Sequence, residues 1–132
     1  AVTDAVGLPK TLLGVDGMAD GRLVGSDLGE KGILQLMDGY AQTRIVVTPI
    51  GGQGFVFGRG NQQISAKVIR EVLRRSGREG IIIVATPAKL AAIGVRPLLV
   101  DTGDPALDRE LAGHARVITG RGERSVARVA AA

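Results

Sequence analysis

The residues best suited to bind a ligand lie in one glycine-rich stretch, Thr48–Ser65, which reads TPIGGQGFVFGRGNQQIS. This stretch has no acidic side chain and contains five glycines, namely Gly51, Gly52, Gly54, Gly58 and Gly60. Glycine loses more conformational freedom on folding than any other residue, so five glycines in one loop need a reason. One reason is close approach of the backbone to an anionic or nucleotide-like ligand, which exposed N–H groups would bind. The other is a long loop that only joins a strand to a helix.

Common catalytic and phosphate-binding patterns are not found around this loop. It lacks the G-x-x-x-x-G-K-[ST] pattern of a P-loop and the G-x-G-x-x-G spacing of a dinucleotide fingerprint. The chain has one histidine, His114, and no visible Ser/His/Asp arrangement. We therefore assign no catalytic residue in this chain.

The acidic residues offer two further candidates. Asp101, Asp104 and Asp108 lie close together and could suggest a divalent metal site. However, Asp104-Pro105 is a typical helix start, so we assign no metal ligand. Asp16 lies in an otherwise apolar stretch, where its carboxylate could accept hydrogen bonds from a ribose. Asp16 could equally be an ordinary turn residue.

The composition narrows the class of protein. Seventeen Lys and Arg against thirteen Asp and Glu give a net charge of +4, which mildly favours an anionic partner and does not require nucleic acid. Aromatic residues make up 2%, which argues against stacking of single-stranded bases. The absence of cysteine excludes disulfides and thiolate metal sites. Since no signal peptide or transmembrane-length apolar run is visible, we expect a cytoplasmic protein without a membrane partner.

The elements on either side of the glycine-rich loop are the clearest in the chain. Arg44–Val47 is predicted to be a buried strand that ends at Thr48-Pro49. After the loop, Ser65 is a good N-cap for an amphipathic helix whose apolar face includes Val68 and Val72. The loop is therefore expected to connect a strand to a helix.

Turn and cap signals predict the other elements. Asp20-Gly21 predicts a hairpin between Leu12–Ala19 and Arg22–Gly25, after which Ser26 could cap a helix. Two short helices are expected to begin and end at Thr86-Pro87 and Gly94, and at Asp104-Pro105 and Gly113. The remaining predicted strands are Ile81–Ala85, Leu98–Val100, Arg116–Thr119 and Val126–Val129.

The order of these elements leaves two fold classes open for a single domain of residues 1–132. Strands that alternate with helices normally indicate an α/β layered sheet. The helices between Ile81 and Gly113 are only about two turns long, however. Such short helices fit a mixed α+β fold equally well.

Two segments, in the same order, resemble the second lobe of NAD kinases. Thr48–Phe55 (TPIGGQGF) resembles that family's TPTGSTAY loop, and Thr86–Val100 resembles its TPI-x-P-H-x-L-x-x-R-P-L-V segment. The segment GGQGFVFGRGNQQIS, with DTGDPALDRELAG downstream, is still more similar to the divergent polyphosphate/ATP-NAD kinase-like branch. The resemblance covers nearly all of the chain, most securely Ile45–Thr119.

This resemblance implies an α+β fold, namely the β-rich, sandwich-like C-terminal lobe of an NAD kinase with short flanking helices. It implies a longer, two-lobed protein whose N-terminal lobe carries a GGDGT motif; this chain has no GGDGT and begins with Ala1. The full-length enzyme would use ATP or polyphosphate, with Mg, to phosphorylate the ribose 2′-hydroxyl of NAD. The chain alone is expected not to be competent, and the lobe is expected to form homo-oligomers.

The resemblance also implies the residues that bind the substrate. Thr48 and the Gly51–Phe55 backbone match the loop that wraps the adenosine part of NAD. Phe55 stands where the family has Tyr, which keeps a stacking or packing face and loses the hydroxyl. The residues assigned to substrate binding are Asp16, Thr48, Gly51, Gly52, Gln53, Gly54, Phe55, Arg59 and Asn61.

Two other functions compete with this one. The first is a non-catalytic nucleotide-binding or oligomerisation module of the same superfamily, similar to its acetoin-catabolism branch. The second is a basic nucleic-acid-binding domain, supported only by charge and by the arginines near the end, Arg116, Arg121, Arg124 and Arg128. We expect no nucleic-acid partner. A GGDGT motif about 100 residues upstream in the gene would favour the kinase.

Overall fold

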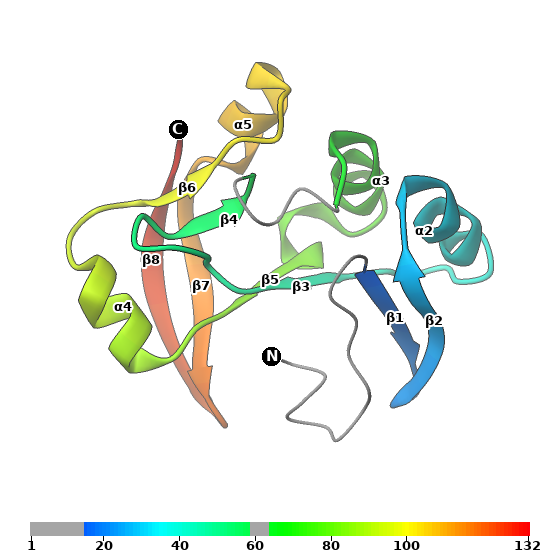
Figure 1. Cartoon of the computed structure of the whole chain (residues 1–132), viewed down its shortest axis with the longest axis horizontal. Helices are drawn as coiled ribbons and strands as arrows, with labels where there is room; N and C mark the ends of the chain where they lie inside the picture. The colour runs from blue at the N-terminus through cyan, green and yellow to red at the C-terminus, as the bar shows by residue number, and fades with distance from the viewer. Residues whose placement is uncertain (1–14, 59–63) are drawn as a thin grey trace.

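The structure of the protein, a computed structural model, describes residues 15–58 and 64–132. These residues form a mixed fold in which a six-stranded sheet, a separate two-stranded hairpin and four α-helices are combined (Figure 1). The predicted α+β class is therefore confirmed. No helix among the described residues is both long enough and apolar enough to span a membrane.

The six-stranded sheet consists of two parallel triplets. Its strands run in the order β3 (Ile45–Val47), β5 (Ile81–Val84), β7 (Gly113–Gly120), β8 (Glu123–Ala131), β6 (Leu98–Val100) and β4 (Phe55–Phe57). Within each triplet the pairing is parallel, and the antiparallel pair of β7 and β8 joins the two triplets. The parallel pairs within each triplet explain why short helices alternate with strands along the chain. The sheet is nevertheless mixed, because β7 and β8 are antiparallel.

The sheet curls so that its two edge strands meet. An antiparallel bridge between Ile50 and Phe55 connects the end of β3 to the start of β4. Buried side chains of both triplets, among them Ile83 and Val117 from one and Leu98 and Val100 from the other, belong to one hydrophobic cluster. The sandwich-like character predicted for the lobe comes from this shared core.

The predicted caps position the helices over this sheet. Ser65 Oγ accepts a hydrogen bond from Val68 N at the start of α3 (Ala66–Ser76), 3.3 Å away. Thr86 caps α4 (Pro87–Ile93), and Asp104 caps α5 (Pro105–Leu111). In Figure 1, α4 lies at the left of the sheet, α5 at the top and α3 at the right. The short 3₁₀-helix η1 (Gly77–Gly80) links α3 to β5.

One sequence prediction about the start of a helix is wrong. Ser26 lies inside β2 (Arg22–Leu28) and caps no helix, because the pairing with β1 (Val15–Ala19) continues until Leu28. The following helix, α2 (Glu30–Met37), has Gly29 as its N-cap. At the end of α5 the C-cap is Ala112, and Gly113 follows directly, with a φ of +124°, so the predicted glycine does stand just past the end of this helix. Gly113 is also the first residue of β7.

Candidate functional site

The first part of the glycine-rich stretch forms a tight turn, Ile50–Phe55, which we call the glycine turn. Ile50 N donates to Phe55 O over 2.8 Å, and Phe55 N donates to Ile50 O over 2.9 Å. Inside this pair, Gly54 N donates to Gly51 O over 3.2 Å. The glycine turn thus joins the two edge strands of the curled sheet.

The glycine turn has an exposed tip and a buried base. Gly51, Gly52 and Gln53 are exposed, whereas Gly54 and Phe55 are buried. The Phe55 side chain is 5% exposed, so its ring packs within the protein. Of the two roles suggested for this ring, the structure therefore favours packing over stacking on a ligand.

Gly54 is a glycine for structural reasons. Its φ is +74°, a backbone conformation that residues with a side chain rarely adopt. A Cβ atom built on it would lie 2.8 Å from Ile93 Cδ1 and 3.2 Å from Leu98 Cδ2. Its carbonyl oxygen accepts a hydrogen bond from Leu99 N over 3.0 Å. The fold therefore requires glycine at this position.

Gly52 has no comparable structural reason. Its φ lies outside the left-handed region, and nothing would lie within 4 Å of a Cβ atom built on it. The backbone at Gly52 is therefore open to solvent on the side where a side chain would stand. An open glycine at an exposed tip is what close approach of a ligand to the backbone would need.

Two basic residues contact the glycine turn, and neither is among the residues predicted from the sequence to bind the substrate. Lys89 Nζ, from α4, donates to Gly51 O over 2.8 Å. Arg96 Nη2 donates to Gly52 O over 3.1 Å, while its Nε donates to Ile93 O at the end of α4. Both residues lie in the Thr86–Val100 segment that resembles the family. Their contact with the turn arises because β3 and β5 are parallel neighbours, so the segments after them leave the same edge of the sheet.

The other residues assigned to substrate binding are not part of the glycine turn, Ile50–Phe55. Thr48 is exposed and directly follows β3. Asp16 lies in β1, where its Oδ1 accepts a hydrogen bond from Asp27 N over 3.4 Å. Figure 1 shows β1 well apart from the connection between β3 and β4, so the structure does not bring Asp16 to the glycine turn. Arg59 and Asn61 lie outside the described residues.

The aspartates after β6 have structural partners. Asp104 Oδ2 accepts from Arg70 Nη2 over 2.8 Å, and this bond, followed by that from Leu107 N, lowers the pKa of Asp104. Asp108 is buried and its Oδ1 accepts from Thr102 N and from Thr102 Oγ1, over 2.9 and 2.7 Å. Within the described ranges, no group of three or more His, Cys, Asp or Glu could hold a metal ion.

Two hollows among the described residues are lined by other parts of the chain than the exposed tip of the glycine turn. One, of about 550 Å³, is lined largely by apolar side chains of β4, β5, β7 and β8, together with arginines such as Arg78 and Arg116. The other, of about 390 Å³, is a charged groove between α2 and α3. No residue of the tip, Gly51–Gln53, lines either of them. Since Gly51, Gly52 and Gln53 are exposed, a ligand at the tip would need a second surface to enclose it.

Comparison with known proteins gives one clear result. A family model described as the ATP-NAD kinase C-terminal domain matches residues 2–129. The chain belongs to this family. The match confirms the resemblance seen in the glycine turn and in the Thr86–Val100 segment, and it relates this ATP-NAD kinase C-terminal domain to kinase and NAD chemistry. No curated protein and no solved structure gives a significant match.

Proposed function

We propose that this chain is the NAD-binding lobe of a two-lobed, NAD kinase-like enzyme. The observation that carries the proposal is the exposed, open backbone at Gly52, within the segment that resembles the family's substrate loop. Family membership supports the kind of substrate. The exposure of Gly51, Gly52 and Gln53 leaves the tip open on its outer side, which supports a site completed by another lobe.

In this proposal the parts of the glycine turn have separate roles. Thr48 and the backbone of Gly51–Gln53 contact the adenosine part of NAD. Gly54 and Phe55 are buried and hold the tip in place through the packing of Gly54 against Ile93 and Leu98. A rigid support of this kind reduces the entropy that a binding loop loses when its ligand is bound.

The chemical step is assigned to the N-terminal lobe of the longer protein. That lobe would bind ATP or polyphosphate with Mg and would supply the base that accepts the proton of the NAD 2′-hydroxyl. The terminal phosphoanhydride bond of the donor would break as the phosphoryl group passes to the 2′-oxygen, which gives NADP and leaves ADP or a polyphosphate shortened by one phosphate. On its own, the C-terminal lobe would bind the nucleotide without turnover, in a cytoplasmic homo-oligomer.

Binding can be tested with Gly52→Gln in the full-length natural protein. A long side chain at the tip should weaken NAD binding about tenfold or more by calorimetry, a loss of about 1.4 kcal/mol. Thermal stability should not change, since Gly52 has open space around it. Gly29→Gln, at another exposed glycine with open space, is the matched control. Unchanged NAD affinity in Gly52→Gln would refute the proposed site.

Turnover separates the kinase from its main alternative. The full-length protein is assayed for NADP formation from NAD with ATP and Mg²⁺, and with polyphosphate and Mg²⁺. Turnover with either donor is the expected result. NAD binding without turnover, in a reading frame that encodes no GGDGT motif, would indicate the non-catalytic nucleotide-binding module instead.

A further inference from the structure

The two cations at the glycine turn are not needed to balance any negative charge there. The structure shows no ion pair between a described carboxylate and either Lys89 or Arg96; their described hydrogen bonds go to backbone carbonyls. The glycine turn itself has no acidic residue. The tip is therefore a locally positive surface, and Lys89 of α4 contacts it directly.

Both cations keep unused hydrogen-bond donors beside the tip. Lys89 Nζ has three N–H groups and makes one described hydrogen bond, to Gly51 O. Arg96 uses Nε and Nη2 for its described bonds, so no described residue accepts a bond from its Nη1. Arg96 is exposed and Lys89 is partly exposed, which leaves these donors accessible.

The backbone N–H groups of the tip do not share the side of the two cations. Lys89 and Arg96 bond the carbonyl oxygens of Gly51 and Gly52, and in these trans peptide units the N–H groups of Gly52 and Gln53 point in the opposite direction. The donors that lie together on the carbonyl side of the tip are therefore those of the two cations. Charged donors of this kind are common partners of phosphate oxygens.

We propose that Lys89 and Arg96, on the carbonyl side of the tip, form a subsite for the diphosphate that joins the two halves of the dinucleotide. This inference rests on the proposed NAD site and specifies which part of the ligand α4 recognises. Lys89 provides a point charge to the phosphate oxygens, and Arg96 keeps α4 against the turn while its Nη1 remains available. The turn then contacts adenosine and α4 contacts the adjoining phosphates.

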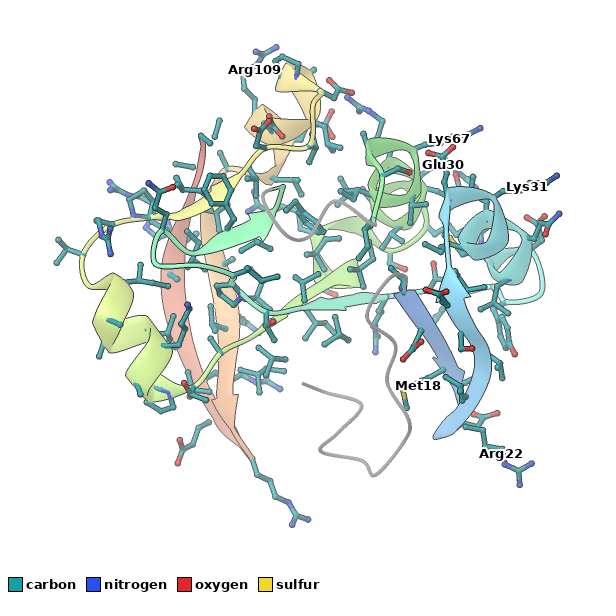
Figure 2. The ribbon with its side chains drawn as sticks, viewed as in Figure 1. Met18, Arg22, Glu30, Lys31, Lys67 and Arg109 are labelled. Atoms are coloured by element: carbon teal, nitrogen blue, oxygen red, sulfur yellow. The ribbon has the colours of Figure 1, made fainter. Side chains whose placement is uncertain are left out.

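The test compares ligands with and without the diphosphate. Calorimetry on the full-length natural protein is done with adenosine, ADP-ribose and NAD, for the wild type, Lys89→Gln and Lys67→Gln. Lys67 is the matched control because Figure 2 shows it on α3, far from α4. Lys89→Gln should bind ADP-ribose and NAD about tenfold more weakly, as expected for loss of a charged hydrogen bond, and adenosine as tightly as the wild type. Lys89→Arg should restore most of the lost affinity.

Salt dependence provides a second readout. The affinity of the wild type for ADP-ribose should fall as ionic strength rises, and this dependence should be weaker in Lys89→Gln. Equal losses for adenosine and ADP-ribose would overturn the subsite, because Lys89 would then only hold the turn. Unchanged ADP-ribose affinity in Lys89→Gln would overturn the subsite as well. If the wild type binds NAD in that case, the proposed function still stands. If the wild type binds neither NAD nor adenosine, the proposed function itself is wrong.

Discussion

Gly52 and Gly54 stand two positions apart in the same turn and have different reasons to be glycine. Gly54 has a φ of +74° and no room for a Cβ atom beside Ile93, whereas Gly52 has neither restriction. At the scale of single residues, the structure therefore separates a glycine that the fold requires from one that is free to serve a ligand. Both positions are glycine in the sequence, which therefore does not distinguish the two roles.

Gly54→Ala should destabilise the protein by about 1–3 kcal/mol, because the new methyl group is strained at this φ and collides with Ile93. Gly52→Ala should change stability by no more than about 0.5 kcal/mol, as for an exposed site without special contacts. Urea unfolding, followed by circular dichroism, measures both. Equal effects of the two substitutions would contradict the division of the turn into tip and base.

The collision with Ile93 can be separated from the backbone strain at Gly54. Ile93→Val removes Cδ1, the atom that would lie 2.8 Å from the new Cβ, and should itself cost about 0.5–1.5 kcal/mol. In this background Gly54→Ala should cost less than in the wild type, by about 0.5 kcal/mol or more. The same urea series on the four proteins measures the coupling. Strict additivity would show that strain alone explains the requirement for glycine.

At the scale of elements, ionic contacts on α3 connect parts of the chain that are far apart in sequence. Arg75 is largely buried; its Nη1 donates to Met37 O and Tyr40 O, which holds the end of α2, and its Nε donates to Glu71 Oε1. Hydrogen bonds from Arg74 and then from Arg75 lower the pKa of Glu71 from the ordinary 4.5 to about 2. The ionised form of Glu71 is therefore favoured in the folded state.

This shift predicts a pH dependence of stability. A carboxyl whose pKa is lower in the folded state contributes stability above its unfolded pKa, and this contribution is lost as the pH falls toward the folded pKa. Glu71→Gln should therefore lower the melting temperature above about pH 5, and its difference from the wild type should shrink between about pH 4.5 and about pH 2. Thermal melts across this range measure the difference. A difference that does not depend on pH would show that Glu71 acts through packing alone.

At the scale of the whole molecule, one antiparallel pair connects the two halves of the sheet. β7 pairs with β5 of the first triplet, and β8 pairs with β6 of the second. The second link between the halves is the bridge of Ile50 and Phe55 at the glycine turn. The site is therefore located at one of the two places where the triplets meet, and its geometry depends on the closure of the sheet.

Removal of part of β8 should consequently abolish cooperative folding. A chain that ends at Ser125 loses the residues of β8 that pair with β6, whereas a chain that ends at Ala131 loses only the bond from Ala132 N to Val100 O. The first should show no cooperative thermal transition, and the second should melt within a few degrees of the wild type. Calorimetry compares them. A cooperative transition in the shorter chain would show that each triplet can fold without the other.

The sequence by itself determined the features that depend on neighbouring residues. Helix starts at Ser65, Thr86 and Asp104 follow from side chains that cap N–H groups two or three residues away, and the structure contains all three caps. The apolar strands and the family resemblance of the glycine turn are also local patterns. The Ser26 prediction failed because a local cap signal competed with a strand pairing that the sequence does not display.

Only the tertiary structure decided which residues face each other. The strand order, the antiparallel junction of the triplets and the contacts of Lys89 and Arg96 with the glycine turn all join residues dozens of positions apart. Such contacts depend on the packing of a shared core, where many apolar residues are interchangeable, so no short pattern encodes them. The same packing buries Gly54 and exposes Gly52, and in this way it defines the surface that is open to a ligand.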